Sequence, residues 1–388
     1  MQTNAKGRAA IVPLLAGVTF LVFGTNLQGV LVPILGHERG SSMIAIGLFS
    51  AAWSTGFVVA CVSVGWLLNL YGHVRAFTLL AMISASCGLL LALAPDDVAW
   101  ILLRLVIGFC YGGLAAIVEG WLIQQAGSGF AFASYMIANL LASLGGTLSL
   151  DVIDPTRWTA LALGAVTVAA SSLPIVLGRL PQPPREPAFR PMLGTLFRAS
   201  PVGATGCVLT GLITGGIGGL GPVFGMMSGL DMQGDTLMLA ANSIGGALAY
   251  LPVTLLASRL DRRLLLALVA GVGIVLCLAI VLGAPRLGTP QIIVVLGAFG
   301  FVQYPLYGLC VGIANADQPD RPSPQIATEV LLLFGLGTIA GPMIAGQVMR
   351  AGPQHLFSFV GLALLLIVGI VALDRSRRPT ATPGLAPG

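Results

Sequence analysis

The sequence predicts an all-α membrane protein with 12 transmembrane helices in two pseudo-symmetric six-helix bundles. Three observations support this prediction: the composition, the recurrence of long apolar stretches, and their even division about a polar, proline-rich segment. Of 388 residues, 56% are hydrophobic and 9% are charged, whereas soluble domains carry about 25% charged residues. Apolar stretches of about 18 or more residues, enough to cross a bilayer core of about 30 Å, recur along the whole chain.

The first apolar stretch is predicted to be a membrane helix, because it is too long for a signal-peptide core and lacks a small-residue cleavage site. Proline, glycine and charged residues delimit the other spans. The predicted spans are 9–34, 42–69, 74–94, 97–123, 129–151, 158–178, 199–223, 234–257, 263–284, 289–314, 324–350 and 352–373. We therefore expect an N-terminal bundle (1–178), a cytoplasmic linker loop (179–198), and a C-terminal bundle with a short cytoplasmic tail (199–388).

The basic residues predict the orientation of the chain. When loops are assigned alternately to the two sides of the membrane, fourteen of the 19 Lys and Arg residues fall on the side of the N-terminus. Four fall on the opposite side, and Arg104 lies within a span. Cytoplasmic loops of membrane proteins carry the excess of Lys and Arg. Both termini are therefore expected in the cytoplasm.

Several function classes are not expected from this sequence. The six cysteines lie in apolar stretches without CxxC spacing, and the three histidines lie at span ends, so we expect no metal site, cofactor or disulfide. There is no phosphate-binding loop, serine-triad spacing or nucleotide-binding domain, so we expect no enzyme. The basic residues lie in short loops beside spans, so the net charge of +5 does not indicate nucleic acid.

Short motifs recur at equivalent places in the two halves. The turn after the second span reads GWLLNLYGHVRAF (65–77), and the turn after the eighth reads TLLASRLDRRLLL (254–266). The fourth span contains RLVIGFCYGG (104–113), and the eleventh contains GLGTIAGPMIAG (335–346). Twelve spans, a long middle loop, a G-x-L-x-D-R-x-G-type turn and the R-x-x-x-G motif together resemble the major facilitator superfamily.

This resemblance implies two six-helix bundles that expose a central site to each side of the membrane in turn. It also implies a bacterial cytoplasmic (inner) membrane protein that works as a monomer among membrane lipids. Two features depart from the family pattern. The acidic residue of the first turn is replaced by Asn69, its counterpart in the second half is Ser258, and the fifth span lacks the Gly-Pro pair of drug/proton antiporters.

In the family that the sequence resembles, spans 1, 4, 7 and 10 line the central cavity. Polar side chains inside spans avoid lipid, so they are the candidates for contacting a small-molecule substrate. The candidates are Asn26 and Gln28 in span 1, Arg104 and Tyr111 in span 4, Tyr135 and Asn139 in span 5, and Gln303, Tyr304 and Tyr307 in span 10. Arg104 could bind a carboxylate or phosphate with two hydrogen bonds, or it could be a structural arginine held by helix carbonyls.

A second set of residues is expected to gate the cytoplasmic side. These residues are Gly65, Asn69, Gly72, Arg75 and Glu119 in the first half, and Ser258, Arg259 and Asp261 in the second. Glu119, near the inner end of span 4, could pair with Arg75 and brace the inner gate, or it could carry protons. Glycine stripes at four-residue spacing in spans 4, 7 and 11 predict close helix packing.

The leading hypothesis is a secondary transporter for a small organic solute, anionic or aromatic, with or without proton coupling. Alternatives on the same fold are a lipid flippase and a non-transporting membrane receptor or assembly factor. A copper transporter is a minor alternative, because Met226, Met227, Met232 and Met238 cluster near the outer ends of spans 7 and 8. Methionines that fill packing gaps explain the same cluster.

Overall fold

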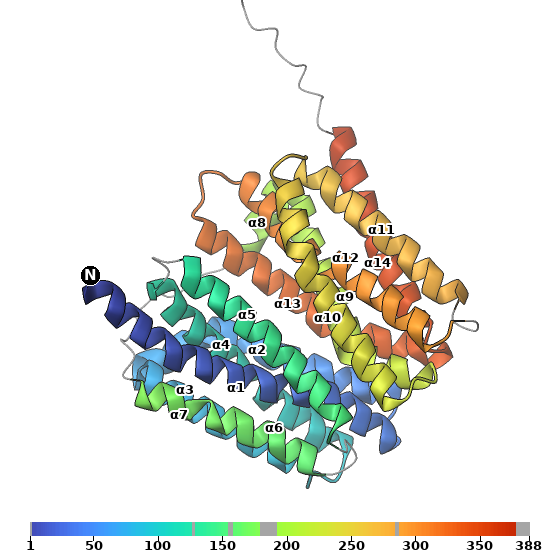
Figure 1. The fold of residues 1–388 in the computed structure, drawn as a ribbon. Coiled ribbons are helices and arrows are strands. Elements are labelled where there is room, and N and C mark those ends of the chain that lie inside the picture. Colours follow the sequence, from blue (N-terminus) through green and yellow to red (C-terminus); the bar gives the residue numbers. More distant parts are fainter. Residues whose placement is uncertain (1, 126–128, 154–157, 179–191, 284–286, 378–388) are drawn as a thin grey trace, which may run out of the picture.

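The structure is a computed structural model that describes residues 2–125, 129–153, 158–178, 192–283 and 287–377 (Figure 1). Regular structure within these ranges is entirely helical. The first half contains α1 (Gln2–Glu38), α2 (Met43–Tyr71), α3 (His73–Leu90), α4 (Asp97–Gln125), α5 (Gly129–Leu148), η1 (Ser149–Asp151), α6 (Trp158–Ala170) and α7 (Ser172–Leu177). The second half contains α8 (Leu193–Ala199), α9 (Pro201–Met227), α10 (Met232–Ala257), α11 (Arg262–Gly283), α12 (Thr289–Ala316), α13 (Ser323–Val348), η2 (Met349–Ala351) and α14 (His355–Arg377).

The long helices coincide with the predicted membrane spans. Eleven stretches of the described residues are long and apolar enough to cross a membrane, and α6 and α7 together form one of them. α5 has 20 residues, which at about 1.5 Å per residue also matches a bilayer core of about 30 Å. The predicted all-α membrane fold is therefore confirmed. The main differences are that α1 begins at Gln2 and that a short helix, α8, lies within the predicted linker.

The helices of each half pack mainly with one another. α2 packs on α4, α1 on α5 and α6, and α3 on α4 and α6; in the second half α9 packs on α13, α10 on α12, and α11 on α14. In Figure 1 the first group, blue to green, lies below the second group, yellow to red. The pairs α2–α4 and α10–α12 are equivalent in chain order, as expected for a repeat.

Glycines make these pairings close. Gly108 of α4 faces the carbonyl oxygen of Trp53 in α2, and Gly300 of α12 faces the carbonyl oxygen of Asn242 in α10. A Cβ atom at either glycine would collide with the opposing backbone. The same crossing thus occurs in both halves, and the predicted close packing of the span 4 stripe is confirmed.

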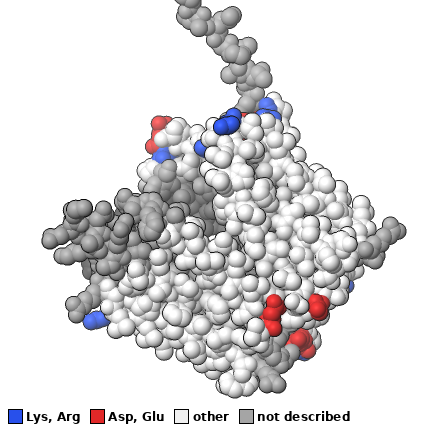
Figure 2. Space-filling view, in the orientation of Figure 1, with Lys and Arg blue, Asp and Glu red and all other residues white. Residues whose placement is uncertain are grey.

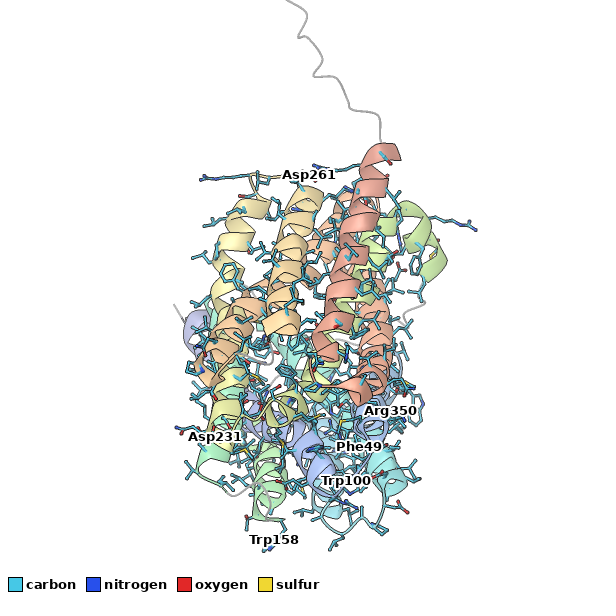
Figure 3. All side chains as sticks on the ribbon, turned by 90° about the vertical axis from the view of Figure 1, so that its right-hand side faces the viewer. Phe49, Trp100, Trp158, Asp231, Asp261 and Arg350 are labelled. Carbon is cyan, nitrogen blue, oxygen red and sulfur yellow. The ribbon has the colours of Figure 1, made fainter. Side chains whose placement is uncertain are left out.

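The outer and inner ends of the molecule are separated by an uncharged band. Figure 3 places Trp158, Asp231 and Arg350 toward one end and Asp261 at the opposite end. In Figure 2 charged side chains lie near the ends of the molecule, with a broad uncharged surface between them. We call the Arg350 end outer and the Asp261 end inner, following the orientation predicted from the basic residues.

The two halves meet closely toward their outer ends. Gly47 near the start of α2 faces the carbonyl of Pro342 in α13, and Gly346 faces the carbonyl of Met43. Near the middle of α2, Val58 packs over Gly335. α9 also contacts α1 and α2, and α10 contacts α5 and η1. These approaches lie in the outer half of α2, and the ribbons of the two halves diverge toward the inner side in Figure 1.

Candidate functional site

Helix α4 carries three of the predicted functional side chains along its length. Arg104 and Tyr111 are seven residues apart, about two helical turns, and so lie on one face of α4. Glu119 follows two turns later, displaced to one side of that face. The sequence makes this helix strongly apolar on either side of these residues, so the three polar groups stand out within a membrane span.

Arg104 is a buried cation without a visible counter-charge. Its side chain is 5% exposed, and its buried Nε has no hydrogen-bond partner. None of the ion pairs found among the described residues includes it. Removing a charge from water without a partner is costly, so an anionic group beside this guanidinium would be strongly stabilised.

Glu119 lies within electrostatic range of tyrosines from both halves. It is solvent-exposed, and its carboxylate lies close enough to Tyr111, Tyr135 and Tyr307 to act on them electrostatically. Cys61 of α2 is also within range of its charge. Tyr307 belongs to α12, whereas the others belong to the first half, so the electrostatic range of Glu119 extends across the interface between the bundles.

The three tyrosines are held by aromatic packing and one hydrogen bond. The Tyr111 ring centroid lies 5.3 Å from that of Trp53, and the Tyr307 centroid lies 4.7 Å from that of Phe334. Asn139, one turn along α5, forms a hydrogen bond with Tyr135. Such rings can stack on an aromatic solute and offer hydroxyl groups to its polar atoms.

The two candidates on α1 have different surroundings. The Asn26 amide donates to Ser143 Oγ at 2.7 Å, and its carbonyl oxygen accepts from Thr147 Oγ1 at 2.7 Å, which ties α1 to α5. Gln28 is 1% exposed, lies against Gly88 of α3, and has no hydrogen-bond partner for either amide atom. Gln28 therefore points into the first bundle, away from the tyrosines.

The three candidates on α12 also differ in their burial and neighbours. Gln303 is buried, and its Oε1 has no hydrogen-bond partner. Tyr304 lies over Gly246 of α10 and is partly exposed. Tyr307 alone is placed near Glu119, so the predicted stripe of Gln303 and Tyr307 extends from the buried part of α12 to the interface.

Within the described part of the chain, the predicted N-terminal gate residues form no ion pair in this conformation. Gly65, Asn69 and Arg75 are exposed, and among the described residues no ion pair joins Arg75 to Glu119. Gly72 has φ 72°, a left-handed backbone conformation that favours glycine, and it separates α2 from α3. The Arg75–Glu119 latch stays a prediction for the conformation closed on the inner side.

The predicted C-terminal gate residues form local bonds. Ser258 Oγ donates to the carbonyl of Leu255. Asp261 accepts from the backbone N–H of Arg263 at 3.0 Å and from exposed Arg375 at 3.3 Å. Arg259 is exposed. These contacts link the α10–α11 turn to the end of α14.

Sequence reasoning missed a stronger ion-pair network beside this turn. Arg263 binds both oxygens of Asp317, at 2.8 and 2.7 Å, and donates through Nε to Asp374 at 2.9 Å. Ser200, at the start of α9, donates to Asp317 at 2.7 Å. The starts of α9 and α11 are thereby joined to the ends of α12 and α14. Charged residues at three span ends on one predicted side, those of Arg263, Asp317 and Asp374, were the available signal.

A second missed ion pair attaches the linker to α13. Arg321 donates to both oxygens of Glu329, at 3.1 and 2.8 Å, and the backbone N–H of Met192 donates to the same carboxylate at 2.8 Å. Glu329 is fully buried. Its carboxylate raises the pKa of Arg321 above the ordinary value for an arginine. Met192 precedes α8, so this pair holds the visible end of the linker on the second bundle.

Asp235 is a further acid that sequence reasoning missed. Asp235 lies within the predicted eighth span, and it is 1% exposed in the first turn of α10.

The methionine cluster was the candidate for binding copper. In the described part of the chain, no group of three or more His, Cys, Asp or Glu side chains lies together where it could hold a metal ion. Met238 of the methionine cluster is buried against Gly225, a packing position.

Two groups of long apolar helices, paired by the same glycine crossing in each half, define a polytopic α-helical membrane protein. The family model described as Major Facilitator Superfamily matches residues 14–322. The chain belongs to the Major Facilitator Superfamily, as its motifs predicted.

Two relatives of this chain by sequence are MFS-type transporters. It is 26% identical over 380 residues to an uncharacterized MFS-type transporter of Enterobacter sp. (strain 638), covering 95% of this chain and 96% of the relative. It is 24% identical over 381 residues to the uncharacterized MFS-type transporter YcaD of Escherichia fergusonii, with the same coverage.

Solved structures share the fold at low sequence identity. The nucleoside transporter NupG superposes with a TM-score of 0.77 and 14% identity, covering 96% of this chain and 100% of that one. A bacterial homologue of the human lysosomal transporter Spinster, in an inward-facing and unoccupied conformation, superposes with a TM-score of 0.68 and 13% identity over 96% of each chain.

Proposed function

We propose that this protein is a secondary transporter that moves a small organic solute across the bacterial cytoplasmic membrane by alternating access. The observation that carries the proposal is the arrangement at the bundle interface. Arg104, a buried cation with no ion pair among the described residues, lies on α4 with Tyr111 and Glu119, and the charge of Glu119 reaches Tyr135 of α5 and Tyr307 of α12. A static assembly factor has no need for an uncompensated buried charge.

The proposed state is inward-facing. Support comes from the backbone contacts between α2 and α13 near Gly47 and Gly346, which close the outer half of the interface. Glu119 near the inner end of α4 is exposed. In the opposite state, residues 1–178 and 199–388 would rock as two units, with both termini on the cytoplasmic side. Residues 179–191 of the linker between them lie outside the described part of the chain.

The proposed solute carries an anionic group and an aromatic or polar ring. A guanidinium binds carboxylate or phosphate with charge-assisted hydrogen bonds, and tyrosine faces stack on planar rings. NupG, which has the same fold, is a nucleoside transporter, so uncharged nucleosides are tested beside the anionic solutes as the alternative. We propose that transport needs no cofactor and that the monomer is the working unit.

The test begins with the thermal stability of the purified protein in detergent, measured with a panel of anionic aromatic metabolites and nucleosides. A solute that raises the melting temperature is then tested for flux in proteoliposomes. Loss of one charge-assisted contact costs about 1.5–3 kcal/mol, so Arg104→Gln should weaken binding by about 10- to 100-fold.

The matched control is Arg350→Gln, because Arg350 is an exposed arginine at the outer end of α13. It should bind and transport as the wild type does. If Arg104→Gln bound the solute as tightly as the wild type does, Arg104 would not be part of the binding site. The absence of flux for every stabilising solute would contradict the transport function.

A further inference from the structure

Asp235 is a buried acid in the outer turn of α10. Its side chain is 1% exposed and is inserted against Gly225 of α9, where a Cβ atom would collide with the carboxyl group. Its Oδ1 is buried and has no hydrogen-bond partner. The preceding acid, Asp231, has a different place: it is exposed and caps the helix by accepting from the backbone N–H of Gly234 at 2.8 Å.

No cation in the described residues faces Asp235. α9 has no Asp, Glu, Lys, Arg or His, and its Cys207 lies toward the inner end. α12 is likewise without charged residues, and its titratable groups Tyr304, Tyr307 and Cys310 follow in its second half. Arg262 and Arg263 lie at the inner end of α11, with Cys277 further along that helix.

The remaining titratable groups on the packed elements are also remote or exposed. On α5 and η1 these are Tyr135, toward the inner end, and exposed Asp151; on α10 itself they are exposed Asp231 and Tyr250. Arg286, in the loop before α12, lies outside the described residues. An ionised carboxylate buried without a partner costs several kcal/mol, whereas the neutral carboxylic acid avoids most of that cost.

We infer that Asp235 is a proton-binding site of the outer gate, occupied by a proton in this conformation. The inference rests on the proposed alternating-access function and gives it a site of proton coupling that is distinct from Glu119. The reaction is a simple protonation: the carboxylate takes one proton from water on the outer side and becomes a neutral acid, and it returns that proton when it ionises.

The position of Asp235 connects its protonation to the gate. The outer part of α10 packs on α5 and η1 of the other bundle, while Asp235 itself packs on α9. When the bundles separate at the outer side, water reaches this region and stabilises the ionised carboxylate of Asp235 by hydration. When they close, the neutral form is favoured, so protonation stabilises the outer-closed state.

Infrared difference spectroscopy on the purified protein tests the site without any solute. The wild type should show the carbonyl stretch of a protonated, buried carboxylic acid at neutral pH, shifted by exchange into D₂O. The band should be absent from Asp235→Asn, which keeps the shape of the side chain. It should persist in Asp231→Asn, the exposed neighbour. Identical carbonyl bands in the wild type and Asp235→Asn across the pH range would overturn the inference.

A distance measurement tests the link to the gate. Spin labels at Val152 and Arg350, exposed positions on opposite halves at the outer end, report outer opening after Cys61 is changed to Ser. In the wild type the distance between the two labels should lengthen as the pH rises, and Asp231→Asn should show the same change. In Asp235→Asn the distance should stay short at every pH. A wild-type distance that does not respond to pH would overturn the coupling. The infrared band with no flux for any solute would fault the proposed function alone.

Discussion

Glu119 is the residue whose environment is most informative. It is an exposed carboxylate with Tyr111, Tyr135 and Tyr307 around it, and no ion pair joins it to Arg75 among the described residues. A latch residue has to be free when its gate is open, and this conformation is closed at the outer end instead. Because tyrosines of both halves lie within electrostatic range of this carboxylate, a direct contact between Glu119 and the solute is the alternative role.

The substitution Glu119→Gln separates these roles. As a latch, Glu119 acts only in the state closed on the inner side, so its loss should shift the balance toward the inward-facing state and leave solute binding nearly intact. Spin-label distances give the conformational balance, and thermal stabilisation by the solute gives binding. Asp151→Asn, an exposed acid at the outer end, is the control. Lost binding with an unchanged balance would assign Glu119 to the site.

The Arg263–Asp317 pair should contribute measurably to stability. Both side chains are largely buried, with 12% and 7% of their surface exposed. Asp317→Asn leaves a guanidinium with one partner, and we expect a loss of about 1–3 kcal/mol, between the values for exposed and buried pairs. The control Asp261→Asn breaks an exposed pair with Arg375 and should cost less than about 1 kcal/mol. Equal melting temperatures for the two variants would contradict this ranking.

At the scale of the helices, glycine crossings determine which faces meet. Gly108 and Gly300 bring α4 onto α2 and α12 onto α10, while Gly47 and Gly346 join α2 to α13 across the bundles. The first type holds each half together, and the second would open in the proposed alternating-access cycle. The Gly-Pro pair that the sequence marks in span 11 lies at this second type of crossing, because the carbonyl of Pro342 faces Gly47.

Bulk at Gly108 should destabilise the first bundle. Gly108→Ala places a methyl group against the carbonyl of Trp53, and overpacking of this kind costs about 1–3 kcal/mol. Gly29→Ala on α1 is the control, because nothing lies within 4 Å of its Cβ position and alanine favours the helix. The melting temperature in detergent should fall for the first variant only. An unchanged melting temperature for Gly108→Ala would contradict the tight crossing.

The sequence predicts the helices better than their rotations. Spans, halves and glycine stripes follow from apolar length and spacing, which are local properties. Gln28 was expected in the cavity but points toward α3, because the rotation of α1 depends on which neighbours it packs against. The Arg263–Asp317 pair joins span ends 54 residues apart, and single-sequence spacing does not say which ends are adjacent. Asp235 lay within a predicted span, and only its burial without a partner distinguishes it.

For the whole molecule, the structure gives the outer-closed state of the proposed two-state cycle. The halves are joined by α2–α13, α1–α9 and α5–α10 contacts, and the approaches at Gly47 and Gly346 lie at the outer end. The ion pairs at the inner end bind helices within the second bundle. Few side chains have to change partners for the bundles to rock, because each half is held by its own crossings. This division makes rigid-body movement of the bundles the expected conformational change.

The central claim, alternating access of two bundles, is tested most directly by paired distance measurements. The outer spin-label pair, Val152–Arg350, is compared with an inner pair at exposed Tyr71 and Gln325, in the wild type and in Gly47→Leu. Leucine at Gly47 collides with α13 in the outer-closed state. Overpacking of this kind costs about 1–3 kcal/mol, so the equilibrium should shift toward the outer-open state by about 5- to 150-fold. The outer distance should lengthen while the inner distance shortens, and Gly271→Leu, whose Cβ position is open, should change neither. An outer distance that lengthens while the inner distance stays fixed would contradict the account.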